Sequence, residues 1–236
     1  MNKISILIVL GISLFSCGPS EEELFSQSRS EMQEGNFEGA LSMLDDLIRK
    51  NSENQAAYNM RGIAKLELGQ AENAISDFDL SVILDSSDYR AFYNRGNAYY
   101  QLENFKQAII DYDHALKLEP KSIDLYINRA NALAQLEKYA ESINDYRFAL
   151  KLDGSSYLAH FNLGRTYYLM DSTNLAKTHF QNTVDIYPGY APAFYFLGMI
   201  SLENEAFEES CILLQKAADL GYQQAIEVQE LYCVED

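Results

Sequence analysis

The sequence is poor in positive charge. Lysine and arginine together number 18, against 35 aspartates and glutamates, and the 236-residue chain has a formal net charge of −17. A chain this acidic repels phosphate backbones and anionic membrane surfaces, so nucleic acid is excluded as a partner. The surplus acid has two interpretations, a solvated outer face or a surface for a basic partner protein, and composition leaves both open.

Proline and cysteine are also scarce, with four and three residues respectively. Between Glu21 and Gln224 no stretch rich in proline, glycine or serine marks a linker between domains. Apolar residues nevertheless make up 47% of the chain, enough to bury a large interior. These features predict one continuous folded array.

That array is a repeat of 34 residues, counted from Glu21. Side chains are large at position 4 of each unit, small at positions 8 and 20, and large at position 24; in the third unit these are Phe92, Gly96, Ala108 and Tyr112. Antiparallel helices approach closely where both carry small side chains. The pattern predicts six helix–turn–helix units, at 21–54, 55–88, 89–122, 123–156, 157–190 and 191–224.

The third unit reads Phe92-Tyr-Asn-Arg-Gly-Asn-Ala-Tyr-Tyr-Gln-Leu, and Phe105, Ala108, Tyr112, Ala115 and Pro120 follow. This sequence and the 34-residue period resemble the tetratricopeptide repeat (TPR). The resemblance implies an all-α fold, an α-solenoid whose helix pairs wind into a right-handed superhelix with the first helices on the concave side. Residues 225–236 are expected to form a C-terminal capping helix. The fifth unit departs locally, reading Asp171-Ser-Thr-Asn at its turn, which is helix-cap chemistry.

Residues 1–16 have the features of a signal peptide. Lys3 precedes the apolar run Ile4–Phe15, which is shorter than the roughly 20 residues that span a bilayer. Leu14-Phe15-Ser16-Cys17 then resembles a bacterial lipobox, which implies cleavage before Cys17 and acylation of that cysteine with palmitate-type chains. The chain would then be anchored to a lipid bilayer. The alternative is an ordinary secretory signal with an incidental cysteine.

Residues 17–23 form a short acidic tether under this hypothesis, containing Ser20-Glu21-Glu22-Glu23. The tether resembles signals that send some lipoproteins to the outer face of the outer membrane. It equally fits a first helical turn, with Ser20 as the cap and glutamates at the positive helix end. The expected location is the cell envelope, at the outer membrane, on either the periplasmic or the exposed side.

The other two cysteines, Cys211 and Cys233, lie where the ends of an antiparallel hairpin would meet. Outside the cytoplasm such a pair can oxidise to a disulfide. The sequence favours two small buried thiols and leaves the bond open.

Arginine and aspartate occur together in the second, third and fourth units. Position 7 is arginine and position 23 is aspartate in these units only, which gives the pairs Arg61–Asp77, Arg95–Asp111 and Arg129–Asp145. Because the two positions lie on facing helices, we predict three ion pairs that hold helix to helix. The alternative is that the arginines bind a carboxylate of a ligand.

A binding groove is expected on the concave side, where the resemblance places positions 2, 5, 6, 9, 12 and 13. Asparagine recurs there, and its amide can pair with successive peptide groups of an extended chain; similar asparagine ladders bind peptide backbones in other TPR proteins. Tyrosine offers large contact area with a polar tip. The alternative is that these residues pack or satisfy each other in an empty groove. The predicted peptide-binding residues are Asn94, Asn128, Asn162, Asn97, Asn131, Tyr93, Tyr100, Phe161, Tyr168 and Tyr195.

No pattern indicates catalysis. The sequence contains no nucleophile motif, phosphate-binding glycine loop or complete metal-ligand set, and His114, His160 and His179 fall at helical positions otherwise used for packing or surface. We therefore expect neither enzymatic activity, nor a metal or other cofactor, nor a small-molecule substrate. The predicted function is a membrane-anchored adaptor that binds a partner protein or its extended peptide. The alternative is a structural or assembly component of an envelope complex, pilotin-like or in outer-membrane assembly, with no peptide in the groove.

Overall fold

The computed structural model describes residues 18–233, which form thirteen α-helices and no β-strand. The helices are α1 (Glu21–Gln33), α2 (Phe37–Lys50), α3 (Gln55–Glu67), α4 (Ala71–Leu84), α5 (Tyr89–Gln101), α6 (Phe105–Leu118), α7 (Ile123–Gln135), α8 (Tyr139–Leu152), α9 (Tyr157–Leu169), α10 (Thr173–Ile186), α11 (Ala191–Glu203), α12 (Phe207–Asp219) and α13 (Gln223–Tyr232). The predicted signal segment 1–16, Cys17 and residues 234–236 lie outside the described residues.

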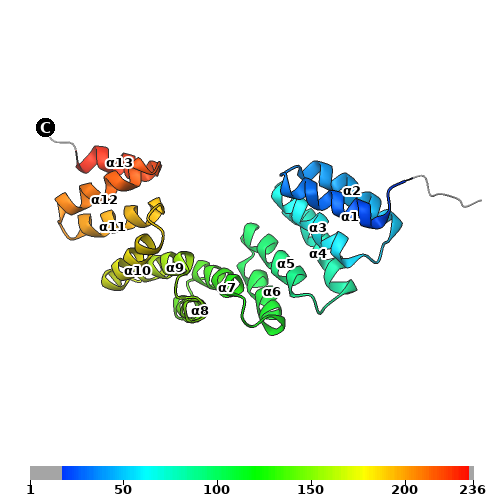
Figure 1. Cartoon of the computed structure of the whole chain (residues 1–236). Helices are drawn as coiled ribbons and strands as arrows, with labels where there is room; N and C mark the ends of the chain where they lie inside the picture. Colours follow the sequence, from blue (N-terminus) through cyan, green and yellow to red (C-terminus); the bar gives the residue numbers. More distant parts are fainter. Residues whose placement is uncertain (1–17, 234–236) are drawn as a thin grey trace, which may run out of the picture.

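The helix pairs stack side by side along an arc (Figure 1). The first helices of neighbouring repeats contact each other, α3 with α5, α5 with α7 and α7 with α9, so they form the inner side of the arc. In Figure 1, α6 and α8 lie on the outer side beneath α5 and α7. The fold is the all-α solenoid of helical repeats that the 34-residue pattern predicts. None of the helices in residues 18–233 combines the length and apolarity needed to cross a bilayer.

Within each repeat, a small side chain lies against a large one on the facing helix. A Cβ added to Gly62 would lie 2.5 Å from the Phe78 ring, and one added to Gly96 would lie 2.7 Å from the Tyr112 ring. In the fourth repeat Ser142 replaces alanine at position 20 and donates a hydrogen bond to the Ala130 carbonyl, at 2.9 Å. The small positions therefore let each helix pair close onto its aromatic residue.

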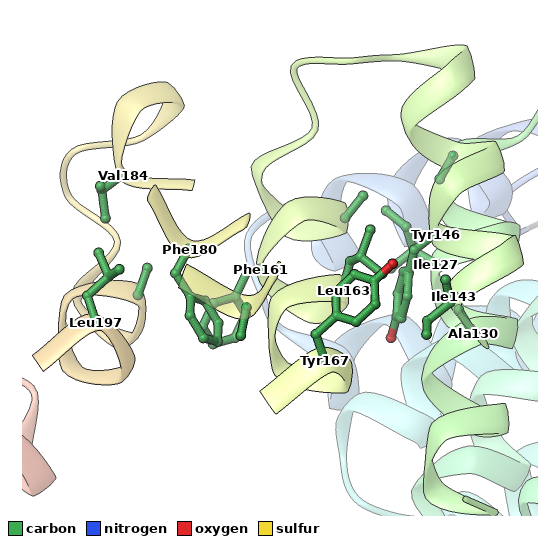
Figure 2. Packing of buried hydrophobic residues seen from close by; sticks show 14 of the residues in the cluster. Ile127, Ala130, Ile143, Tyr146, Phe161, Leu163, Tyr167, Phe180, Val184 and Leu197 are labelled. Atoms are coloured by element: carbon green, nitrogen blue, oxygen red, sulfur yellow. The ribbon is translucent and has the colours of Figure 1, made fainter. Parts of the chain in front are cut away.

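A continuous apolar cluster joins repeats four to six. It includes Tyr146, Leu163, Phe180 and Leu197, all at most 1% exposed. Figure 2 shows Phe161 and Phe180 together in this cluster, and their ring centroids are 5.7 Å apart. Each such side chain stabilises the fold by about 1.5–3 kcal/mol through burial. Neighbouring repeats here are thus held together mainly by apolar packing.

The first helices of repeats one to five each begin after a residue whose side chain caps the helix, whereas α11 begins after Tyr190 without a side-chain cap. Ser20 accepts a hydrogen bond from the Glu23 backbone N–H while the Glu23 carboxylate accepts one from the Ser20 N–H, a capping box. Glu21, Glu22 and Glu23 therefore belong to the first turn of α1. Ser172 does not make the cap bond that its sequence context suggests: it donates instead to the Met170 carbonyl, so α10 begins without a side-chain cap.

The turn between the two helices of each repeat uses a left-handed residue. Gly35 and Gly69 occupy this place with φ of 76° and 73°. In the next four repeats the same position holds a residue with a side chain, at φ between 55° and 60°: Glu103, Glu137, Asp171 and Glu205. A left-handed backbone disfavours residues with a Cβ, so these four turns store local strain.

The last helix is fastened by a disulfide between Cys211 of α12 and Cys233, which directly follows α13. The sequence favoured two free thiols, and that expectation was wrong. Helix α13 folds back along α12, which brings the two Cα atoms to 5.6 Å, within the span of a disulfide. The bond closes the C-terminal end of the solenoid.

Candidate functional site

Three successive cavities follow the inner side of the arc from α1 to α9. The first, of about 610 Å³, is lined by residues that include Phe25, Arg29, Asn59, Tyr93 and Asn94. The second, of about 510 Å³, is lined by Leu66, Glu67, Asn97, Tyr100, Gln101, Tyr112, Asn128 and Asn131. The third, of about 200 Å³, shares Tyr100 and Asn131 with the second and adds residues that include Asn162 and Arg165. We refer to these three cavities together as the groove.

The first helices supply most of the groove because they form the inner side of the arc. Two residues of second helices also reach it, Tyr112 of α6 and Tyr146 of α8. Their rings are buried and their hydroxyls donate to the amide oxygens of Asn97 and Asn131 respectively. Burial raises the pKa of both phenols, so each remains a protonated donor at neutral pH.

The asparagines of neighbouring repeats are bonded to one another. Asn94 Nδ2 donates to Asn59 Oδ1 at 3.0 Å. Asn128 Nδ2 donates to Asn97 Oδ1 at 3.1 Å and to the Tyr93 hydroxyl at 3.2 Å. The amides therefore satisfy each other in part, as the empty-groove alternative requires. Each still carries a group with no partner among residues 18–233: the Oδ1 atoms of Asn94 and Asn128, and the Nδ2 atoms of Asn97 and Asn131.

Asn162 differs from the other two asparagines at position 6. The Asn162 side chain makes no hydrogen bond within residues 18–233. Its backbone carbonyl accepts one from Thr166 Oγ1 at 2.9 Å. It lines the smallest cavity beside Arg165, whose guanidinium lies 5.9 Å from the centre of the Phe161 ring. The asparagine series thus continues to α9 with a free amide.

The predicted aromatic residues divide into two groups. Tyr93 and Tyr100 line the groove. Phe161 does not, and this corrects the prediction: it is 5% exposed, because Tyr190, the residue before α11, and Phe196 of the next repeat pack edge-on against its ring.

Tyr168 and Tyr195 also lie away from the three cavities. The Tyr168 hydroxyl donates to Glu203, and the Tyr195 ring packs 5.2 Å from that of Tyr222, the residue before α13. The groove therefore ends near α9. Helix α13 packs against the last repeat.

The three arginine–aspartate pairs are formed. Arg61 contacts Asp77 through Nε at 2.9 Å and Nη2 at 2.6 Å, and the same two-pronged geometry joins Arg95 to Asp111 and Arg129 to Asp145. Hydrogen bonding to the aspartate raises the pKa of Arg61 and of Arg95. The arginines are thus occupied by the fold and do not line the groove.

Each arginine also holds a second aspartate, which the sequence reasoning missed. Its Nη1 atom contacts the preceding repeat, and the three contacts are Arg61–Asp45 at 2.7 Å, Arg95–Asp79 at 2.6 Å and Arg129–Asp113 at 2.6 Å. The signal was present at position 25, which is aspartate in the first three repeats, one repeat ahead of each arginine. Each arginine with its two aspartates, which we call a clamp, therefore joins two repeats as well as two helices.

Two histidines meet on repeat five. The Nδ1 atoms of His160 in α9 and His179 in α10 are 3.0 Å apart, and the His179 ring stacks on Tyr167. Burial is the main cause that lowers the pKa of His179 to about 4, and it also lowers the pKa of His160. Within the described part of the chain, no three histidine, cysteine or acidic residues are grouped to hold a metal ion.

Profiles of the tetratricopeptide repeat family match most of the helical array. Four of them match residues 25–89, 89–122, 130–171 and 158–190. The chain is a tetratricopeptide repeat protein. No curated protein sequence matches it.

Solved TPR structures superimpose on most of this TPR protein. A structure from a functional characterisation of Pseudomonas aeruginosa PilF is 15% identical, with a TM-score of 0.76, and the match covers 89% of this chain and 96% of that one. A tetratricopeptide repeat protein from Parabacteroides merdae is 21% identical, with a TM-score of 0.71, over 91% of this chain and 84% of that one. YrrB, described as a TPR protein with an unusual peptide-binding site, is 25% identical, with a TM-score of 0.61, over 79% and 97%.

Membership of the family gives the coarse function. TPR proteins are generally non-catalytic scaffolds for interactions between proteins, and the fold of this chain supports a protein–protein interaction adaptor.

Proposed function

We propose that this TPR protein is a lipid-anchored adaptor of the cell envelope that binds an extended segment of a partner protein in its groove. One observation carries the proposal: each of α5, α7 and α9 presents at least one amide group that lacks an internal partner among residues 18–233, and these groups line three adjoining cavities. An extended chain carries peptide groups at regular intervals, so it matches such a series. The peptide-binding site named for the similar protein YrrB agrees with this use of the fold.

The anchor is proposed from the sequence around Cys17, which lies outside the described residues. Two features of the fold support an envelope location. Residues 18–20 separate Cys17 from the start of α1, a short tether between a lipid and a folded body. The bond between Cys211 and Cys233 fits an oxidising compartment. Two or more acyl chains, at about 0.8 kcal/mol for each buried methylene, would hold the protein on a membrane.

The alternative, an assembly component with an empty groove, requires packing through other surfaces, such as the ends of the array. Both ends are largely polar. Helix α1 exposes Glu21, Glu22 and Glu23, and α13 exposes Gln223, Glu227 and Glu230, although Leu231 and Tyr232 are also exposed beside them. Polar end helices stop a repeat array from extending. The groove is therefore the better-supported binding surface.

Crosslinking in intact membranes followed by affinity purification tests the adaptor function. We would compare the parent protein with Asn94→Ala/Asn128→Ala/Asn162→Ala and with Asn73→Ala/Gln107→Ala/Asn174→Ala. The control residues are exposed amides on second helices and make no side-chain hydrogen bond within residues 18–233. The proposal expects partners that the parent and the control recover equally and that the groove variant loses at least tenfold.

Folding is checked by circular dichroism, because Asn94 and Asn128 also donate internal hydrogen bonds. Equal recovery of the same partners by the folded groove variant would favour the assembly-component alternative. Recovery of no partner by the parent would contradict the adaptor function itself. Detergent-phase partitioning of Cys17→Ala tests the anchor separately, since an unlipidated chain should move to the aqueous phase.

A further inference from the structure

The last turn of α4 carries apolar side chains that the fold does not use. Position 29 of the repeat is exposed in all six repeats, but in the second repeat it holds Ile83, which is 77% exposed. Leu80 and Leu84 are also exposed and share one helix face with Ile83. We call these three residues the α4 patch. The other five repeats fold with a charged residue at position 29: Arg49, Lys117, Lys151, Asp185 and Asp219.

The α4 patch lies at the edge of the solenoid from which the N-terminal tether leaves. Lys50, the last residue of α2, donates a hydrogen bond to the Pro19 carbonyl. Gln55, the first residue of α3, donates to Ser81 of α4 at 2.8 Å. The starts of α1 and α3 and the ends of α2 and α4 therefore meet at one edge, which we call the junction edge. In Figure 1 these four helices lie together at one end of the array.

The tether is too short to let this edge move far from a membrane. Only Gly18, Pro19 and Ser20 separate Cys17 from α1. Three residues span at most about 11 Å when fully extended. An acylated Cys17 would therefore hold the start of α1 close to the bilayer surface. Packed helices are about 8–10 Å apart, so the last turn of α4, one repeat away, is within reach of the same surface.

The opposite edge of the solenoid is acidic. In all six repeats the turn between the two helices, at positions 13–19, contains at least one aspartate or glutamate. Near the tether the junction edge carries both signs of charge, with Arg49 and Lys50 ending α2 beside the glutamates that begin α1. An anionic lipid surface repels the acidic edge more strongly than the mixed one. Charge therefore favours a membrane at the junction edge, and apolar contact has to supply the attachment there.

We infer that the α4 patch lies in the headgroup region of the bilayer beside the lipid anchor, so that two contacts fix the junction edge toward the membrane. The inference rests on the proposed anchor and adds an orientation to it. Apolar side chains gain free energy at this depth of a bilayer. Because the anchor already holds the chain at the surface, the patch binds at high effective concentration and needs only a few side chains. The acidic edge then points away from the membrane.

The contact can be measured with a single tryptophan, since the chain contains none. We would purify Ile83→Trp from membranes as the lipoprotein and reconstitute it in phosphatidylcholine vesicles whose acyl chains are brominated near the headgroup. Ile212→Trp is the matched control, because Ile212 is 54% exposed on α12, at the other end of the array. Bromine quenches tryptophan only at short range. We expect quenching at least threefold stronger for Ile83→Trp than for Ile212→Trp.

A second comparison separates the patch from the tether, which alone brings this edge near the lipid. Leu84→Trp serves as the reporter, alone and combined with Ile83→Lys. Repeats three and four already carry lysine at position 29, so the double variant should fold like the single one, as circular dichroism would check. We expect Ile83→Lys to reduce quenching of the reporter at least threefold. Unchanged quenching would mean that the α4 patch makes no contact of its own, and the inference would be wrong.

The remaining outcomes are also decisive. Vesicle-bound Ile83→Trp that is quenched no more than Ile212→Trp would overturn the orientation while leaving the anchor intact. A lipoprotein that does not float with the vesicles would contradict both the proposed anchor and the inference. A blue shift of Ile83→Trp emission that grows with protein concentration in detergent, without lipid, would show that a second copy of the chain covers the patch instead.

Discussion

The guanidinium of Arg95 in α5 donates hydrogen bonds to both carboxylate oxygens of Asp111 in α6, with Nε–Oδ2 at 2.8 Å and Nη2–Oδ1 at 2.7 Å. Asp111 is only 2% exposed, while the second acid bound by Arg95, Asp79, is about half exposed. The charge of the buried Asp111 carboxylate is therefore balanced by Arg95. The exposed Asp79 carboxylate is also solvated by water.

Removing Arg95 should therefore destabilise the protein more than removing the whole pair. Arg95→Leu leaves Asp111 buried without a partner, and we expect a loss of about 3 kcal/mol in the free energy of unfolding. Arg95→Leu/Asp111→Leu should recover part of that loss, as measured by urea denaturation. A double variant no more stable than Arg95→Leu alone would show that the pairing does not stabilise the repeat.

Adding a methyl group to Gly96 should also be destabilising. The new Cβ would lie 2.7 Å from Tyr112 Cε1, a distance that forces the two helices apart. Overpacking of this kind lowers stability by about 1–3 kcal/mol. Gly154→Ala is the matched control, because the nearest atom to its Cβ is 3.7 Å away. Thermal melts of both variants test the point; equal melting temperatures would contradict it.

Glu137→Gly should stabilise the protein, although it deletes a side chain. Glu137 has φ of 57°, and a left-handed residue with a Cβ loses about 1 kcal/mol relative to glycine. Asn144→Gly, at an exposed place within α8, should do the opposite, because glycine weakens a helix interior. Denaturation midpoints that move in the same direction for both variants would count against this reading of the turn.

Acid should weaken repeat five through His179. The pKa of His179 is lowered to about 4 in the folded state. Between pH 6.5 and pH 4 the unfolded chain therefore binds a proton at His179 that the folded chain does not bind. The stability contributed by neutral His179 is therefore present above pH 6.5 and is lost as the pH falls through this window. The ring is only half-buried, so we expect a loss on the order of 1 kcal/mol.

The comparison that tests this is unfolding at pH 7 and pH 4.5 for the parent and for His179→Gln. The variant should show the smaller decrease, since it has no imidazole to protonate. Identical decreases would mean that other groups, such as the carboxylates, govern the acid response.

Much of the fold could be predicted from the sequence because the same packing pattern recurs in six successive repeats. Gly62, Gly96, Gly164 and Gly198 recur opposite the bulky residues Phe78, Tyr112, Phe180 and Leu214, and the structure packs each against its partner. The position 7 and position 23 charges likewise appear together, so their pairing can be read from the sequence. The 34-residue period predicts contacts within a repeat well, because two residues that touch recur together at the same two positions of successive repeats.

Contacts between repeats were harder to predict. Phe161 was expected in the groove, yet Phe196 of the following repeat covers it, and Asp79 was missed as the second partner of Arg95. The asparagine pattern located the cavities but could not show that Asn128 is bonded to Asn97. These outcomes depend on how one repeat is rotated on the next, which the spacing of residues along the chain does not encode.

The disulfide depended on a distance of the same kind. Cys211 and Cys233 are separated by 22 residues, and their approach is set by where α13 packs on α12. Tyr222 and Val228 pack with Leu214 and Ala225 at that junction and fix the course of the last helix. Composition could state only that a bond was possible.

The clamps occupy only one half of the array, and this gives its two halves different sensitivities to their surroundings. From α2 to α8 the repeats are joined by apolar clusters and, in addition, by arginines that each hold two acids, one of them solvated. From α7 to α11 they are joined by aromatic and aliphatic packing. Added salt loosens contacts to solvated charges, and cooling weakens apolar association. Ionic strength therefore acts first on the half that carries the first two cavities, and cold acts first on the half that has no arginine clamp and ends at the disulfide.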